Sequence, residues 1–191
     1  MFEERRNFNK TIICLALRPL LTLDTTRHQH NRIIEDEAAH ELYMKRAIIL
    51  AKNSRLQPFG ALLVDDSGVV VGEGWNRASI NPVLHGEIDA INNCATKHPA
   101  IDWERLTLFT TAEPCAMCQA AVAWTGISGV VYGSSIPFLR GLGWRTIEIR
   151  AEDMAERVRF RQCVIKGGVL ELECNGLFKD AISRQTIVVP H

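Results

Sequence analysis

The stretch TTAEPCAMCQAAVAWTGI, residues 110–127, places two cysteines three positions apart, directly after a proline. A strand-like segment, RLTLFTT, precedes the pair, and a helical pattern follows it to about Trp124. A pair at this spacing in the first turn of a helix points both sulfurs toward one spot. The fold must bring other groups to that spot if Cys115 and Cys118 hold a metal. The pair alone fits a redox motif, a structural zinc site or a catalytic one.

Upstream, the segment NPVLHGEIDAI contributes His85 and Glu87, and 26 residues separate Glu87 from Pro114. One imidazole and two thiolates give three protein ligands, which is the usual set of a catalytic zinc site that keeps a fourth position for water. Glu87 is not needed as a ligand and would move protons instead. His-x-Glu followed by Pro-Cys-x-x-Cys is a known signature of zinc-dependent nucleobase deaminases.

Two other readings of the cysteine pair explain less of the sequence. A redox pair would be expected after the first strand of a βαβ unit, and it would leave His85 and Glu87 without a role. A structural zinc site would need a fourth protein ligand, such as Cys94 or His98. Cys94 lies nine positions after His85, about two and a half helical turns on, and should face away from the metal.

Hydrophobic periodicity predicts strands and helices that alternate along most of the chain. We expect an α/β fold, with a mixed sheet and helices packed on its faces. The expected helices are 35–56, one that begins near residue 85, about 115–124, 136–142, 152–161 and 169–178. The expected strands are 60–64, 69–74, 106–110, one that begins at residue 129, and 146–149.

Composition narrows the class of protein further. The 191 residues carry 22 basic and 22 acidic side chains, so the chain has no net charge and nothing favours nucleic acid as a partner, although a local basic patch remains possible. Six cysteines are too sparse for a disulfide scaffold. No apolar stretch is long enough to span a membrane, so no membrane partner is expected.

The first 31 residues form either an N-terminal extension or a signal similar to twin-arginine export signals. Arg5 and Arg6 are followed by Phe8, Lys10 and a modest apolar run, as in such signals. Arg18 and Pro19 interrupt that run, and no small-residue cleavage site follows. The protein is expected to be cytoplasmic, or periplasmic if the signal works. Residues 32–191 are predicted to form the catalytic domain.

HGEIDAI, together with TTAEPCAMCQAAVAWTGISGVVYG, resembles the cytidine deaminase-like superfamily over roughly Glu37 to Phe178. The similarity is strongest to the branch of guanine, cytosine and tRNA adenosine deaminases. It implies a three-layer α/β/α sandwich with a central five-stranded mixed sheet. It also implies zinc on His85, Cys115 and Cys118, with Glu87 as the proton shuttle.

The resemblance also suggests substrate contacts. Asn76 would hydrogen-bond the substrate, Phe59 and Trp124 would lie near its ring, and the backbone of Ala61 would lie near the metal. Three of the four have a structural alternative: a turn residue for Asn76, and core packing for Phe59 and Trp124. The Glu113 side chain is expected to contact a helix start.

The predicted substrate is a small nucleobase or nucleoside. VGEGWNRASINPVLHGEIDAIN is similar to fungal cytosine deaminases and AAVAWTGI to guanine deaminases. The acidic residue that guanine enzymes carry after the VVYG strand is missing until Glu148. A tRNA-specific adenosine deaminase is the first alternative, although the arginines of the C-terminal third are mixed with acids. A non-catalytic zinc-containing binding protein is the second, and Glu87 argues against it.

Relatives of this kind form dimers or larger assemblies, so the resemblance implies a homodimer. The apolar C-terminal segment SRQTIVVPH, residues 183–191, would then cross to the partner or cover the site.

Overall fold

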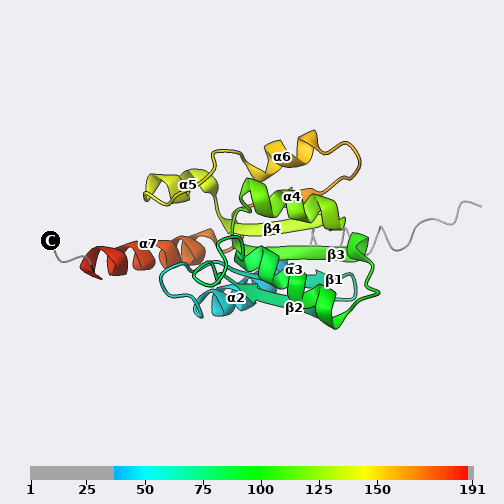
Figure 1. The fold of residues 1–191 in the computed structure, drawn as a ribbon, viewed down its shortest axis with the longest axis horizontal. Coiled ribbons are helices and arrows are strands. Elements are labelled where there is room, and N and C mark those ends of the chain that lie inside the picture. Colours follow the sequence, from blue (N-terminus) through cyan, green and yellow to red (C-terminus); the bar gives the residue numbers. More distant parts are fainter. Residues whose placement is uncertain (1–36, 189–191) are drawn as a thin grey trace, which may run out of the picture.

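The computed structural model describes residues 37–188, and the predicted N-terminal signal lies outside this part of the chain. The described chain forms one mixed sheet with helices on both faces (Figure 1). In chain order the elements are α2 (Glu37–Ala51), β1 (Gly60–Asp65), β2 (Val70–Trp75), α3 (Gly86–Lys97), a 3-10 turn (Trp103–Arg105), β3 (Leu106–Ala112), α4 (Ala116–Thr125), β4 (Gly129–Ser134), α5 (Ile136–Gly141), α6 (Ala151–Arg157), β5 (Val164–Lys166) and α7 (Glu171–Val188).

The sheet has five strands in the order β2-β1-β3-β4-β5. β1 runs antiparallel to both of its neighbours, whereas β3, β4 and β5 are parallel. This confirms the expected α/β architecture with a five-stranded mixed sheet.

Alternating side chains of β1 build the two apolar cores. Leu62 and Val64 pack on one face with Met44 of α2 and Cys174 of α7. Ala61 and Leu63 point to the other face and join a second cluster, which includes Ala90 and Cys94 of α3 and Val122 of α4. Because successive strand residues face opposite sides, a strand that is apolar throughout needs cover on both faces. The sandwich therefore has three layers.

Two sequence expectations for the C-terminal half were wrong. Residues 146–149 form no strand, and Ile147 and Ile149 are 53% and 40% exposed. The fifth strand is instead Val164–Lys166, which pairs with Gly129–Val131 of β4. Three residues, of which Val164 is exposed, are too few to show the alternation that identifies strands.

Helix lengths differ from the prediction at both ends of the domain. α2 ends at Ala51 rather than at residue 56, in a series of turns before Pro58. α7 continues to Val188, ten residues beyond the predicted end at Phe178. Ala181 explains the continuation, because it is buried and follows Cys174 and Phe178 on the same helical face. Residues 183–188 of the expected tail are therefore helical.

The carboxyl ends of β3 and β4 lie side by side, with Ala112 paired with Ser134. Parallel sheets bind their ligands at this edge. From Ala112 the chain runs through Glu113 and Pro114 directly into α4. None of the helices within residues 37–188 is long and apolar enough to cross a membrane.

Candidate active site and metal centre

Two helix starts supply the predicted metal ligands. His85 is the residue before α3, and Cys115 is the residue before α4, with Cys118 in the first turn of α4. Such positions usually carry a side chain that accepts a hydrogen bond from the first turn. Neither His85 nor Cys115 does so. Both side chains are therefore left to face a shared point.

The three ligand atoms form a nearly equilateral triangle. Nδ1 of His85 lies 3.7 Å from Sγ of Cys115 and 3.6 Å from Sγ of Cys118, and the two sulfurs are 3.7 Å apart. A tetrahedral zinc ion with ordinary bond lengths needs about 3.8 Å between two sulfurs and about 3.6 Å between sulfur and nitrogen. The triangle fits zinc with the fourth position open. No other group of this kind was found among the described residues.

Local electrostatics favour metal binding at this triangle. The Cys118 thiol and the His85 imidazole hydrogen-bond the Cys115 sulfur and lower its pKa to about 4. The same contact with Cys115, together with burial, raises the pKa of Cys118, and the hydrogen bond to Cys115 raises the pKa of His85. Zinc would bind both sulfurs as thiolates and the imidazole in its neutral form, so metal binding must release protons.

Glu87 lies beside the triangle without being one of its corners. Its side chain is in the first turn of α3 and is only 3% exposed. One carboxylate oxygen is 3.5 Å from Sγ of Cys118, and the other is 3.4 Å from the Thr110 hydroxyl. Burial raises the pKa of this carboxyl. A group held near the metal position, with a pKa displaced toward neutrality, is suited to proton transfer.

The contact from Thr110 was not part of the predicted site. Thr110 lies in β3, and its hydroxyl donates toward Glu87. Thr111, the next residue, accepts a hydrogen bond from the backbone N–H of Gly60 and donates to the Pro58 carbonyl. A pair of threonines at the end of a buried strand, just before Pro-Cys-x-x-Cys, is the sequence signal that could have indicated these roles.

Close backbone approach places the start of α3 on the sheet. A Cβ added at Gly74 would meet the Ala90 N–H and lie 2.5 Å from the carbonyl oxygen of Gly86. A Cβ added at Gly86 would lie 2.7 Å from the carbonyl oxygen of Phe59. These two glycines let α3 and the strand ends touch without side chains between them. As a result Phe59 lies against the residue that follows His85.

Two of the residues predicted to contact substrate, Asn76 and Phe59, contact each other. The Asn76 backbone N–H donates to the Phe59 carbonyl at 2.8 Å. Asn76 is 7% exposed, its Nδ2 donates to Gln57 at 2.7 Å, and it lines a cavity of about 650 Å³. The Phe59 ring packs against Trp144 and Phe178, with ring centroids 5.6 and 4.9 Å away.

The other two predicted contacts lie in different settings. Ala61 is fully buried in β1, directly opposite Thr110, and so lies one strand from the Glu87 partner. Trp124 is 79% exposed, with its ring against Phe160. It lies nine positions after Cys115, roughly 13 Å along the helix axis. Within this chain, Trp124 is neither a core residue nor a neighbour of the triangle.

Glu113 contacts helix starts, as expected, and it contacts two of them. Its carboxylate accepts hydrogen bonds from the backbone N–H of Ile136 in α5 and of Ala151 in α6, both at 2.8 Å. It also pairs with Arg150 at 2.7 Å.

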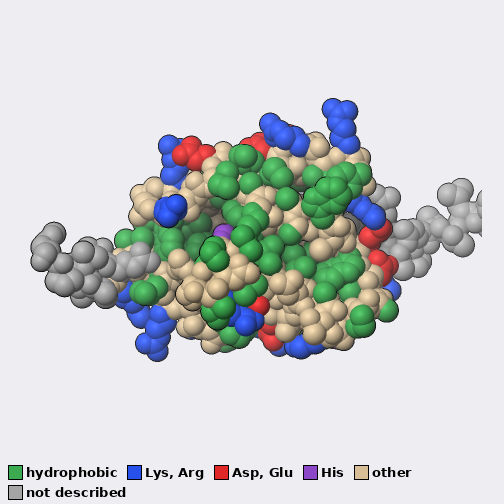
Figure 2. All heavy atoms as spheres, viewed as in Figure 1, with side chains coloured by type: hydrophobic (Ala, Val, Ile, Leu, Met, Phe, Trp, Pro, Cys, Tyr) green, Lys and Arg blue, Asp and Glu red, His purple; other side chains and the backbone are tan. Residues whose placement is uncertain are grey.

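One face of the molecule is hollowed, with hydrophobic side chains around the hollow (Figure 2). Figure 2 shows one histidine side chain recessed in the middle of this face, with hydrophobic side chains beside it. Lys and Arg side chains stand mainly around the outline of the molecule rather than in the hollow. The hollow therefore suits a flat and largely uncharged ligand better than a phosphate chain.

Together, a mixed sheet, two converging helix starts, a His-Cys-Cys triangle and a buried carboxylate define a zinc-dependent hydrolase site. Residues 37–134 match the cytidine and deoxycytidylate deaminase zinc-binding region. The chain belongs to this deaminase family. Zinc as its metal and hydrolytic deamination as its class of reaction follow from this membership.

Individual relatives act on different substrates. The tRNA-specific adenosine deaminase of Buchnera aphidicola is 33% identical over 75% of this chain and 88% of its own length. The guanine deaminase of Bacillus subtilis is 36% identical over 50% of this chain. For several curated relatives, including that enzyme, the alignment spans only 58–64% of their own length.

The fold is also similar to those of solved structures. A mutant of the protein NE0047, in complex with 8-azaguanine, superposes with a TM-score of 0.69 at 25% identity. That superposition covers 77% of this chain and 86% of the other.

Proposed function

We propose that this deaminase hydrolyses the exocyclic amine of a small nucleobase or nucleoside, guanine- or cytosine-like, and releases ammonia. The observation that carries the proposal is the His85–Cys115–Cys118 triangle with the buried Glu87 carboxylate 3.5 Å from one corner. A protein that used zinc only for structure would have no need of a buried proton carrier at this place. The non-catalytic alternative is therefore set aside.

Three side chains would hold zinc, and a fourth would move protons. When bound, zinc supplies the Lewis acidity that makes water a good nucleophile near neutral pH. Glu87 accepts one proton from the attacking water and passes it to the ring nitrogen. It then takes the second proton from the hydroxyl group added to the substrate and passes that one to the departing amine, which leaves as ammonia. The Thr110 hydroxyl orients the carboxylate through its contact at 3.4 Å. Asn76, with a donor and an acceptor on one side chain, suits a base edge or a ribose.

The charge pairing in the C-terminal third favours a small substrate over RNA. Several arginines of the C-terminal third are held in ion pairs: Arg140 with Glu148, Arg150 with Glu113 and Arg161 with Glu104. An arginine whose charge is balanced by a neighbouring carboxylate attracts phosphates less strongly. The 8-azaguanine complex of NE0047 supports a purine-sized ligand in a fold of this kind.

A tRNA-specific adenosine deaminase is the second candidate. The similarity to the Buchnera enzyme favours it, because that alignment covers more of this chain than the alignment with the Bacillus guanine deaminase.

Ammonia release from the zinc-loaded protein tests both candidates. The substrates are guanine, cytosine, adenine, their nucleosides and an anticodon stem-loop, and Glu87→Ala is the control. Release from one small base that is lost in Glu87→Ala supports the first candidate. Release from the stem-loop alone would replace it with the second. Zinc-loaded protein that leaves every substrate intact would contradict both.

We propose further that the chain works as a homodimer. An exposed pair of aromatic rings in contact, Trp124 and Phe160, supports this, since their centroids are 5.2 Å apart and the side chains are 79% and 58% exposed. Light scattering after size exclusion tests the idea. Trp124→Ala should yield monomers, and Leu172→Ala, an exposed apolar residue elsewhere, should not. A wild-type monomer would refute the proposal.

A further inference from the structure

Glu113 is the most heavily hydrogen-bonded carboxylate beside the site. Its side chain is fully buried and lies two residues before the zinc ligand Cys115. Oε1 accepts from the Ala151 N–H and from Nε of Arg150, at 2.8 and 2.7 Å. Oε2 accepts from the Ile136 N–H at 2.8 Å and shares the Arg150 Nε at 2.9 Å. A buried charge with this many donors is held in one orientation.

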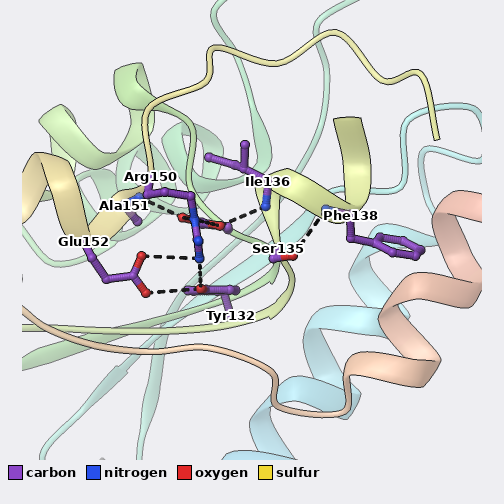
Figure 3. A network of polar contacts seen from close by, with 8 residues as sticks. Tyr132, Ser135, Ile136, Phe138, Arg150, Ala151 and Glu152 are labelled. Carbon is purple, nitrogen blue, oxygen red and sulfur yellow. Dashed lines mark hydrogen bonds and ion pairs between the residues drawn. The ribbon is translucent and has the colours of Figure 1, made fainter. Parts of the chain in front are cut away.

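These bonds fix both ends of one long connection. The chain leaves β4 at Ser134, forms α5, runs without regular structure to residue 150 and then enters α6. Ile136 begins this connection, and Ala151 ends it. A single carboxylate therefore binds the segment 135–151 at its beginning and at its end, at Ile136 and Ala151, which Figure 3 labels.

The same segment supplies most of an aromatic and apolar cluster beside the site. Four of the seven members of this cluster come from the segment, and the others come from strand ends and α7: Phe138, Leu139, Leu142, Trp144, Phe59, Ala112 and Phe178. Trp144 meets Phe59 and Phe178 edge to face, at 5.6 Å in both cases. Among the described residues, no acceptor lies within hydrogen-bonding distance of the buried Trp144 Nε1.

The cluster adjoins the metal loop and α3 through the backbone. Ala112 immediately precedes Glu113, and the Phe59 carbonyl lies against Gly86, the residue after His85. An edge-to-face set of rings whose backbone adjoins the metal-ligand segments is a suitable wall for a flat heterocycle. Its position depends on segment 135–151, and hence on Glu113.

Arg150 completes the anchor and connects it to the sheet. Its guanidinium donates to the Tyr132 hydroxyl at 3.0 Å, and Glu152 lies 3.5 Å from the same guanidinium (Figure 3). Arg150 supplies the positive charge that a buried carboxylate requires. Glu152 is half exposed, and the hydrogen bonds to α5 and to the backbone N–H of Ala151 are made by Glu113 instead.

We propose that Glu113 is a positioning residue for the reaction, which fixes segment 135–151 so that Trp144 and Phe59 form the wall against which the substrate ring binds. This inference rests on the proposed function, because it assumes a flat heterocyclic substrate. It assigns Glu113 to substrate binding rather than to zinc binding, although Glu113 lies only two residues before the zinc ligand Cys115.

Glu113→Gln is the direct test. An amide of the same shape offers one acceptor oxygen, and its NH₂ group faces N–H donors, so at least one end of the segment loses its partner. We expect KM to rise roughly tenfold or more, with kcat within about threefold of wild type and with the zinc content per chain unchanged. Glu156→Gln, at an exposed position of α6, is the matched control and should leave KM unchanged.

A double-mutant cycle with Trp144→Ala separates positioning from general damage. If Glu113 acts through the wall, Trp144→Ala alone raises KM, and adding Glu113→Gln to it raises KM little further. Multiplicative effects on KM would overturn the inference. So would an unchanged KM in Glu113→Gln, or a loss of zinc from it. If Glu113→Gln does not fold, Arg150→Lys, which keeps the charge but loses the two-oxygen contact, carries the same prediction.

Hydrogen exchange gives a readout that does not depend on turnover. In Glu113→Gln, amides of residues 135–151 should exchange faster, while those of β3 and α4 stay protected. Unchanged exchange in 135–151 would also overturn the inference. A wild-type protein that turns over none of the tested substrates contradicts the proposed function instead. The two failures are thereby distinguished.

Discussion

Replacing Glu87 by glutamine tests the proton-transfer role with almost no change of shape. The amide cannot accept the proton of the attacking water, although it can keep the contacts to Thr110 and Cys118. General acid-base catalysis contributes about 10²- to 10⁴-fold to turnover. Because Glu87 is the ionisable group next to the triangle that is not itself a ligand, we expect kcat to fall by about this factor. That corresponds to roughly 3–5 kcal/mol of barrier.

The same substitution should leave the metal in place. None of the three triangle distances involves Glu87, so zinc bound per chain, measured by elemental analysis, should equal that of wild type. Initial rates of ammonia release give kcat on the loaded protein. Glu73→Gln is the matched control, because Glu73 lies in the edge strand β2 and pairs with Arg46 of α2. Turnover within tenfold of wild type, or loss of zinc, would refute the assigned role.

The metal-free protein offers a second, independent measurement. Burial raises the pKa of Glu87 above its usual 4.5, so the unfolded chain holds the carboxyl proton less tightly than the folded chain. This contribution to stability is fully present below pH 4.5 and is lost as pH rises through the folded-state pKa. At pH 7, metal-free Glu87→Gln should therefore be more stable than wild type in urea, by about 1–3 kcal/mol. The gain should disappear near pH 4.

Three more predictions concern the metal, the packing and alkaline pH. Cys118→Ser should lose zinc during dialysis against a chelator that leaves wild type loaded, because one corner of the triangle no longer offers a thiolate. Gly74→Ala should lower the free energy of unfolding by about 1–3 kcal/mol in urea titrations, since its Cβ would meet the backbone of α3. Burial raises the pKa of Cys174 from 9.0 to about 12, so its contribution to stability is lost as pH rises from 9 toward 12. Between pH 8 and pH 10, the free energy of unfolding measured in urea should fall less for Cys174→Ala than for wild type. Equal decreases would contradict the raised pKa of Cys174.

The sequence was most informative where chemistry demands fixed spacing. His85, Glu87, Cys115 and Cys118 could be grouped because a three-ligand metal leaves few arrangements, and helix starts were expected at both ligand segments. The structure brings the four side chains together around one point. Long apolar strands such as β3 were also predictable, since they need cover on both faces.

Contacts between distant segments were less predictable. Nothing in local periodicity distinguishes residues 146–149, which were expected to form a strand, from Val164–Lys166, which do. The choice depends on which segment reaches the free edge of β4. The partners of Glu113 lie 23 and 38 positions downstream, beyond the reach of any local pattern. Trp124 lies in a helix whose apolar residues suggest burial, yet the structure leaves it exposed.

The way in which segment 135–151 is held at both ends determines where this domain can accept additional residues. Both ends of the segment are held at one carboxylate, so their separation does not depend on what lies between them. Closing a longer loop costs only about 0.6 kcal/mol for each doubling of its length. Residues inserted between 145 and 149 would lengthen the connection between α5 and α6 beyond Trp144, and none of the three metal ligands lies in it. This connection is therefore a place where the scaffold can accept an insertion, because a graft there leaves the starts of α3 and α4, which carry the metal ligands, unchanged.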